Sequence, residues 1–318
     1  MVSLPPMNRI IITLVALALL SACTTKDERR ASVRRPIIDL KLKTTPVKDQ
    51  GRSSLCWVFG MLATIETEHL MRGDSVNLSV AYVARMALRQ RMQDAYLSRG
   101  TRPQHLRGMA SNALALIAQH GLLAYDTYHV ENNSIFASLA NKTYNLCRVT
   151  MAHREGLARL HERFNDLMDN AIGSLPKMQY LYGAGYTFGE FGRSVCRTDE
   201  YVALTSFTHH PFNSAFVLEV NDNVNRDYFY NLPIDTLVAI TERSLKAGHP
   251  VCWEGDTSEE GFDFVEGYAR LPQHSTAPTQ EMRQVAFETL RTTDDHCMAI
   301  VGLAHDSQGK RYFIMKNS

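Results

Sequence analysis

Excess charge of either sign is absent from this sequence of 318 residues. Its 34 lysines and arginines nearly balance 33 aspartates and glutamates, which leaves a formal net charge of +1. This balance gives no electrostatic reason to expect nucleic acid as a partner. Low-complexity segments and fixed-period repeats are also lacking, so a repeat architecture is not indicated. With 45% hydrophobic residues, the composition is that of an ordinary globular protein, and the length suits one large domain or two joined lobes.

No apolar run near the N-terminus is long enough to span a bilayer. The run over 10–20 fits the core of a signal peptide, and Leu20-Ser21-Ala22-Cys23 follows it. A small-residue cleavage site that ends at a cysteine resembles the lipobox of bacterial lipoproteins, in which that cysteine becomes the lipidated first residue. The resemblance implies a signal peptide over 1–23, a charged tether over 24–36, and export to the bacterial cell envelope with Cys23 as the membrane anchor. A simple secretory signal, cleaved nearby, is the alternative interpretation.

The six cysteines include no CxxC pair, so neither a zinc ribbon nor a dithiol redox motif is indicated. Cys147, Cys196 and Cys252 are expected to be small buried hydrophobic residues, although export leaves a disulfide open. The adjacent His209 and His210 are weak candidates for metal ligands, because neighbouring side chains on a strand point apart and no carboxylate follows at ligand spacing. A place in a loop or at the end of a strand is expected for them instead. The sequence therefore implies neither a metal nor an organic cofactor.

Helical patterns dominate the first part of the chain and strand patterns the second. Helices are expected from Cys56 to a stop at Gly73, after an N-cap at Ser79, over 110–120, over about 153–172, from Pro233 to Gly248 and over 280–290. Strands are expected over 201–207, 215–220, 250–253, 298–304 and 312–316, with a tight hairpin at 306–309. The pattern predicts an α+β fold with a helical lobe over about 45–200, a β-rich lobe over about 201–318 and a cleft between them.

Cys56 stands at the predicted start of a helix, directly after a polar loop. A thiol nucleophile needs a lowered pKa, which a helix N-terminus and a nearby imidazole provide, a group that orients the imidazole, and donors for the oxyanion. A buried structural cysteine has no reason to take that place. Gln50 is close enough along the chain to donate an amide hydrogen bond beside the Cys56 backbone N–H. The stretch therefore indicates a nucleophile.

The segment PVKDQGRSSLCW, at 46–57, resembles the nucleophile segment of the papain-like cysteine peptidases. The distal segment DDHCMAIVGLAHDSQGKRYFIMKNS is similar to that family's segment with a histidine and, after a hairpin, an asparagine. The resemblance implies that Cys56 is the nucleophile, His296 the general base and Asn317 the orienter of the imidazole, with Gln50 in the oxyanion hole. It also implies a papain-like two-lobed fold with the site in the cleft.

A third segment, GMASNALALIAQHGLLAYDTYH, begins at Gly108 and resembles the papain helix that follows the substrate-binding glycine. The resemblance implies that Gly108 lets the substrate backbone approach closely, as its missing Cβ allows. It also implies that Met109 lines the pocket for the second substrate side chain, and that Trp57 belongs to the same substrate-binding set. A plain turn at a helix start is the alternative for Gly108.

The resemblance covers most of the chain from Pro46 onward. TSFTHHPF, NLPID and EMRQVAFETLRTTDDHCM look most like the bleomycin hydrolase and aminopeptidase C branch, which mostly lacks disulfides. Accordingly, Ser53 and His105 stand where other members have a disulfide. Cys297 departs from the small residue expected after the histidine. The end at Ser318, where the family continues with Ser-Trp-Gly, is a second departure; it predicts a truncated C-terminus and means that strict aminopeptidase action does not follow.

Carboxylates around the distal segment are expected to be solvated. Asp294 and Asp295 precede His296 and could stabilise its imidazolium, but a solvated pair is the simpler interpretation. Asp256 and the acidic run to Glu259 are predicted to lie on the surface.

Two functions are open from the sequence. The first is a lipid-anchored cysteine peptidase, an aminopeptidase or an endopeptidase, that hydrolyses peptide bonds of a peptide or protein substrate. The second is a non-catalytic papain-like surface lipoprotein that binds peptides or partners. An oligomer is compatible with either function.

Overall fold

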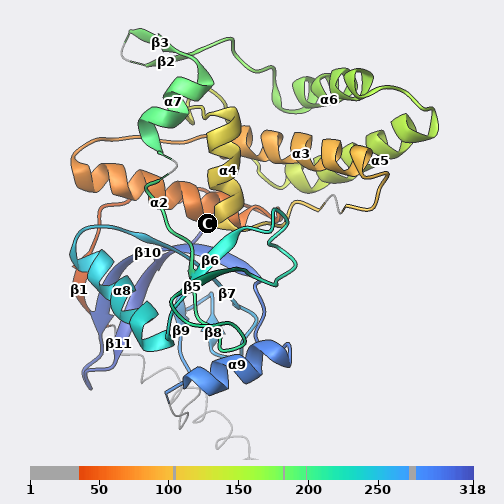
Figure 1. Cartoon of the computed structure of the whole chain (residues 1–318). Helices are drawn as coiled ribbons and strands as arrows, with labels where there is room; N and C mark the ends of the chain where they lie inside the picture. Colours follow the sequence, from red (N-terminus) through yellow and green to blue (C-terminus); the bar gives the residue numbers. More distant parts are fainter. Residues whose placement is uncertain (1–35, 103–104, 182, 198, 272–276) are drawn as a thin grey trace, which may run out of the picture.

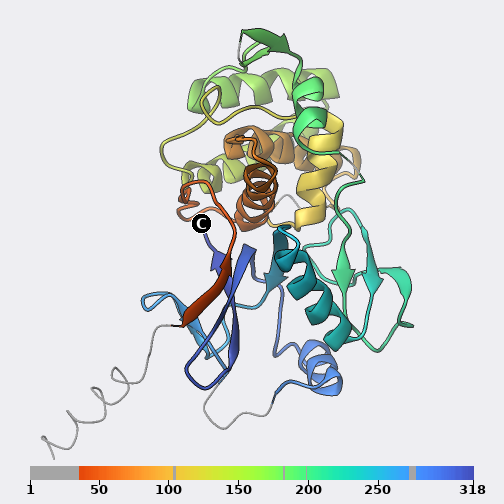
Figure 2. The ribbon, with the colours of Figure 1, turned by 90° about the vertical axis from the view of Figure 1, so that its left-hand side faces the viewer.

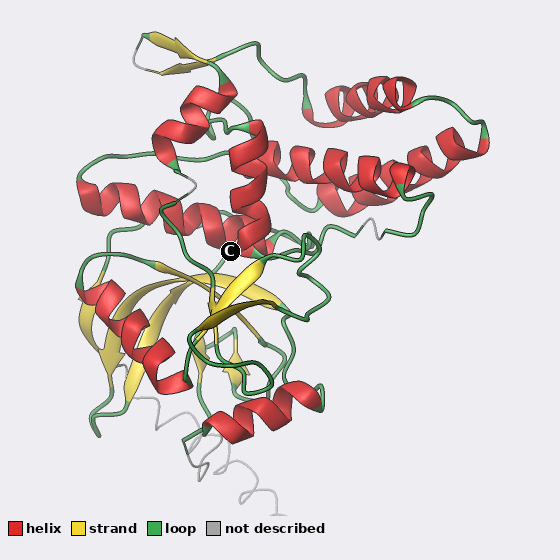
Figure 3. Ribbon diagram, viewed as in Figure 1, coloured by secondary structure: helices red, strands yellow, loops and turns green. Residues whose placement is uncertain are grey.

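The first helices along the chain and the largest sheet occupy different parts of the molecule (Figures 1 and 3). The computed structural model describes residues 36–318 apart from 103–104, 182, 198 and 272–276. This mixture of helix and sheet is consistent with the predicted α+β class. The helices are α2 (Cys56–Arg72), α3 (Val80–Leu97), α4 (Ala110–His120), α5 (Ile135–Ala152), α6 (Leu157–Ile172), α7 (Phe188–Val195), α8 (Ile234–Lys246) and α9 (Gln280–Glu288).

The largest sheet joins the two ends of the described chain around β10 (His296–His305). Its antiparallel partner on one edge is β11 (Arg311–Lys316). On the other edge β1 (Ile37–Lys41) pairs with the end of β10, and β7 (Val251–Gly255) pairs with its start. The smaller sheets comprise β4 (Leu204–Thr205), β5 (Ser214–Val217) and β6 (Tyr228–Asn231), then the pairs β2 (Gln179–Leu181) with β3 (Ala184–Tyr186) and β8 (Phe262–Asp263) with β9 (Tyr268–Ala269).

Helix α2 links the helices to the large sheet. Its residues are buried without a break from Trp57 to His69, because α3 and α4 pack on one side and β10 and β7 on the other. Gly60 sets the distance to β10, since a Cβ there would lie 2.7 Å from Cys297 Sγ and 3.2 Å from the Cys297 carbonyl carbon. The helix thus places its first residue, Cys56, against the start of β10. The C-terminal end of the chain also lies between the helices and the sheet in both views (Figures 1 and 2).

Most predicted helix starts are confirmed, and two helices, α5 and α7, were missed. Helix α4 has the predicted bounds, and the Ser79 hydroxyl caps α3 by accepting from the Tyr82 N–H at 3.0 Å. The helix expected over about 153–172 is confirmed as α6, which begins at Leu157, four residues later than predicted, and ends at Ile172. Helix α5 carried its own signal: Phe136, Leu139, Thr143, Cys147 and Thr150 are buried at helical spacing.

The strand predicted over 298–304 lies within the longer β10, whereas another predicted strand is much shorter in the structure. The expected strand over 201–207 is reduced to β4, and β6, which was not predicted, pairs with both β4 and β5. The C-terminal hairpin is confirmed, with its turn at 306–309 and a positive φ of 79° at Gly309. Within the described residues, no helix is both long and apolar enough to cross a bilayer. Cys23 and the predicted signal peptide lie outside the described residues.

Candidate functional site

His296 and Asn317 meet at the open end of the β10–β11 hairpin. His296 is the first residue of β10 and Asn317 follows β11, where Ala299 pairs with Lys316. The His296 Nε2 and Asn317 Oδ1 atoms are 2.7 Å apart. Because an amide oxygen only accepts, Nε2 carries a hydrogen and Nδ1 is left to accept a proton.

Cys56 lies against the residue that follows this histidine. The main-chain N–H groups of Cys297 and Trp57 donate to its sulfur, which lowers the pKa of the thiol. Burial raises that pKa more strongly, and the carboxylates of Glu254 and Asp222 raise it further. The pKa of the Cys56 thiol therefore lies above its ordinary value, whereas the sequence predicted a lowered one.

Gln50 lies on the loop before α2, and its amide is held from two sides. Its Oε1 accepts a hydrogen bond from the Ser318 hydroxyl at 2.8 Å, and its Nε2 donates to the Ser53 carbonyl at 3.2 Å. The amide nitrogen has two hydrogens, so one is left for another acceptor. Because Ser318 follows Asn317, this contact joins the loop that carries Gln50 to the segment that carries the asparagine.

A buried carboxylate ties the same segments together. Glu66 on α2 is 1% exposed and accepts hydrogen bonds from Lys48, from Thr45 and from the Leu78 N–H. Lys316 at the end of β11 donates to the Thr45 hydroxyl at 2.7 Å, and burial lowers its pKa. The loop before Cys56, the helix that Cys56 begins and the strand before Asn317 therefore share one cluster of charges.

Gly108 and Met109 lead into α4 directly above Trp57. A Cβ on Gly108 would lie 2.9 Å from Asn112 Oδ1 and 3.1 Å from the Trp57 ring, so a side chain does not fit there. Trp57 is 1% exposed, and its Nε1 donates to the Leu106 carbonyl at 2.8 Å. It supports the glycine segment and has no surface for a substrate, so the prediction of direct contact through Trp57 is wrong.

A large cavity of about 1800 Å³ lies between the helices and the sheets. Met109, predicted to line a substrate pocket, is among its lining residues together with Ala110, Glu254 and Asp295. Cys56, His296 and Asn317 do not line it. They adjoin it, because Asp295 precedes the histidine and Glu254 pairs with Cys297 across β7 and β10.

Glu254 and Asp294 bring partly buried carboxyl groups to the wall of this cavity. The Glu254 Oε1 atom accepts from the Ala110 N–H at 2.6 Å, yet burial raises the pKa of Glu254 to about 8, and the charges of Asp294 and Asp222 add to the rise. Burial also raises the pKa of Asp294, whose Oδ2 has no partner among the described residues. Asp222 is paired, since Arg107 Nε contacts both of its oxygens at 2.9 Å. The prediction of a solvated Asp294 is wrong, and Glu254 was missed because its acidic side chain interrupts an apolar strand pattern without any motif.

Two further carboxylates that were predicted to be solvated are bonded instead. Asp256 is 6% exposed and accepts from the Thr293 N–H at 2.7 Å. Asp295 accepts from the Thr257 N–H at 2.7 Å. Both bonds fix the segment just before His296 to the loop that follows β7.

Phe264 covers the histidine from the turn between β8 and β9. The ring centroids of Phe264 and His296 are 6.4 Å apart at an interplanar angle of 84°, an edge-on contact. Phe264 is 59% exposed, so most of its ring faces solvent while its contact with the imidazole is retained.

The fold as a whole matches one that is already known. The crystal structure of PepW from Lactobacillus rhamnosis HN001 (DR20) matches 100% of this chain and 86% of its own, with a TM-score of 0.66 and 17% sequence identity. The chain has the fold of PepW. No family model matches the sequence, and no curated protein matches it. The likeness to PepW therefore concerns the arrangement of helices and strands and does not extend to the residues of the site.

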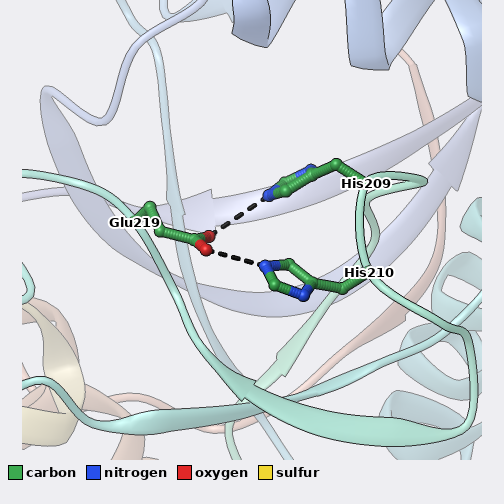
Figure 4. A group of neighbouring side chains, drawn as sticks. All are labelled: His209, His210 and Glu219. Carbon is green, nitrogen blue, oxygen red and sulfur yellow. Dashed lines mark hydrogen bonds and ion pairs between the residues drawn. The ribbon is translucent and has the colours of Figure 1, made fainter.

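Within this PepW-like fold, His209 and His210 converge on one carboxylate (Figure 4). Their Nε2 atoms lie 3.2 and 2.7 Å from the two oxygens of Glu219. The predicted place in a loop or at a strand end is confirmed, because the two residues lie in a loop. The expectation that no carboxylate accompanies them is wrong, since both rings contact Glu219. Gln284 Nε2 donates to His209 Nδ1 at 3.0 Å, and its orientation is fixed because its Oε1 accepts from the Thr208 N–H at 2.7 Å. His209 Nε2 therefore carries a hydrogen, which suits a bond to Glu219 rather than to a metal.

Proposed function

We propose that this protein is a cysteine peptidase with a papain-like arrangement of two lobes, in which Cys56 attacks the peptide carbonyl. The bond between His296 Nε2 and Asn317 Oδ1, at 2.7 Å, carries the proposal. It orients an imidazole whose Nδ1 has no hydrogen-bond partner among the described residues, and the next residue, Cys297, donates its N–H to the sulfur of Cys56, which begins a helix. The fold shared with PepW supports the proposal at the level of architecture.

The proposed reaction runs through a thioester. The thiol proton of Cys56 passes to His296 Nδ1, and the sulfur attacks the carbonyl carbon. The Cys56 N–H and the second amide hydrogen of Gln50 stabilise the oxyanion. The imidazolium then gives its proton to the leaving amine as the peptide bond breaks. Water, deprotonated by His296, attacks the thioester, which releases the acid and restores the thiol.

Because the pKa of the Cys56 thiol is raised, a thiolate at Cys56 needs a positive charge beside it. Burial disfavours an isolated thiolate, so the thiolate is stable only when a cation lies beside it. An imidazolium at His296 would be that cation, and the two groups would ionise as a pair. The Asn317 carboxamide stabilises the imidazolium by accepting its Nε2–H.

A non-catalytic binding protein is the second candidate, and the raised pKa of Cys56 is the observation that favours it. Labelling with an epoxide inhibitor of papain-like enzymes, read by intact mass on the detergent-solubilised full chain, separates the two. A single adduct that is lost in Cys56→Ala supports the peptidase. A folded protein that takes no adduct argues for the binding protein.

We also propose that the mature chain is exported and held on a bacterial envelope membrane by a lipid at Cys23. The support is the Leu20-Ser21-Ala22-Cys23 sequence after its apolar run. Metabolic labelling with an alkyne fatty acid should tag the wild type and leave Cys23→Ala untagged. A tag that persists in that variant would remove the anchor from the proposal.

A further inference from the structure

Glu254 is a carboxylate without a counter-ion on the wall of the large cavity. Its Oε1 takes the Ala110 N–H at 2.6 Å, and within the described residues its Oε2 has no hydrogen-bond or ion-pair partner. The antiparallel register places it opposite Cys297, whose N–H donates to the sulfur of Cys56. Glu254 therefore stands where the cavity reaches the proposed nucleophile.

The surrounding protein does not neutralise this group. Buried carboxylates are normally paired with a cation or with several donors, because removal from water is costly. Glu254 has one donor, and the charges of Asp294 and Asp222 repel its own. Arg107, which lines the same cavity, is already bonded to both oxygens of Asp222. The part of the wall around Glu254 therefore favours a positive charge.

The rest of the wall suits a long, flexible cation. Met61, Met109 and Met298 line the same cavity, and their side chains offer apolar surface. Lysine and arginine bury their aliphatic stems on such surface and place the charged head on a carboxylate. A small inorganic cation would gain nothing from these methionines.

Building on the peptidase function proposed above, we propose that Glu254 is a specificity-determining residue that binds a lysine or arginine side chain of the peptide substrate beside the bond that is cleaved. The free α-amino group of a substrate has the same charge, and blocked N-termini tell the two apart. The prediction concerns substrate choice, because Glu254 lies beside the proposed site and takes no part in the proton transfers.

The test uses N-terminally blocked fluorogenic peptides with arginine or citrulline at the first, second or third position before the cleaved bond. Citrulline keeps the shape of arginine and lacks its charge. At pH 9, we expect wild type to prefer arginine at one position by about tenfold or more in kcat/KM. In Glu254→Gln the ratio should fall to about one, with the citrulline rate within about threefold of wild type. Glu288→Gln is the control, because Glu288 lines the same cavity, is exposed and also loses one negative charge.

Several outcomes overturn the inference. A ratio near one in an active wild type, or a ratio that Glu254→Gln leaves unchanged, removes it and leaves the peptidase function standing. A charge preference seen only with unblocked peptides assigns Glu254 to the α-amine instead. If Glu254→Gln melts far below wild type, Glu254→Ala and Glu254→Asp are measured, and only Asp should keep any preference for arginine.

If the protein hydrolyses none of these peptides, the peptidase proposal fails. The role of Glu254 in recognising a cation can then be tested by peptide binding. Calorimetric titration of Cys56→Ala with the arginine and citrulline peptides gives the same comparison without turnover. Tighter binding of the arginine peptide, lost on adding Glu254→Gln, supports cation recognition. Equal affinities overturn it.

Discussion

His296 and Asn317 are 21 residues apart in the sequence, and their side chains are 2.7 Å apart in space. One hairpin closes this distance, because the pairing of Ala299 with Lys316 leaves both residues at its open end. The same strand, β10, packs on α2 through the contact of Cys297 with Gly60. The sheet therefore positions the imidazole and its partner, and the helix brings Cys56 to Cys297, the residue that follows the histidine.

A variant without the Asn317 amide keeps the His296 imidazole and loses the group that orients it, so it tests the contribution of that orientation. In Asn317→Ala, Nε2 loses its acceptor and the ring can rotate, so the share of molecules with Nδ1 toward the nucleophile falls. We expect kcat/KM to fall by about 10- to 100-fold, as the loss of an orienting group does in related chemistry, with the melting temperature nearly unchanged. Peptide hydrolysis and epoxide labelling measure it. Lys310→Ala, in the turn of the same hairpin, is the control and should keep wild-type activity.

The raised pKa of Glu254 should make the stability of the folded protein depend on pH. Its pKa is about 8 in the folded chain against an ordinary 4.5, so between these values the folded protein holds a proton that the unfolded chain releases. Stability should therefore fall as pH rises from 4.5 through about 8. Asp294 and Cys56, whose pKa values are also raised, face the same region, as does the charge of Asp222, and all three are present in both wild type and variant.

Glu254→Gln has no charge to bury, so its advantage over wild type should grow with pH. We expect it to melt about 2–5 °C above wild type at pH 9 and close to wild type at pH 5. Calorimetry at pH 5, 7 and 9 measures the difference. Glu288→Gln should show no such trend, and an equal shift of Glu254→Gln at all three pH values would contradict a buried carboxylate.

A single methyl group added at Gly60 should increase the distance between α2 and β10. Gly60→Ala places its Cβ 2.7 Å from Cys297 Sγ and 3.3 Å from the Met298 nitrogen, so strand and helix must separate. Overpacking of this kind costs about 1–3 kcal/mol. Denaturant titration measures the loss, and activity should fall with it because Cys56 and His296 lie on the two sides. Adding Cys297→Ala should restore part of the stability; a wild-type melting curve for Gly60→Ala alone would show that the packing is looser.

Local signals in the sequence predicted local structure well. Ser79 caps α3 and Gly73 ends α2 with a positive φ of 88°, because these residue types act within one turn of their own position. The meeting of Glu254 with the Ala110 N–H could not be predicted, since the two are 144 residues apart and no pattern joins them. The distal histidine and asparagine were placed by resemblance, and their catalytic roles stay predictions.

Phe264 should protect the bond between His296 and Asn317 from water. Its ring meets the imidazole edge-on at 6.4 Å and is otherwise exposed, so its loss removes little packing from the core. In Phe264→Ala, water can compete for the imidazole N–H, and we expect kcat to fall by about three- to tenfold with the melting temperature within about 2 °C of wild type. Val265→Ala is a matched control, because Val265 is the next residue on the same turn and is 95% exposed. Equal activities of the two variants would mean that the turn does not shield the imidazole, whereas a loss confined to Phe264→Ala would assign that role to its ring.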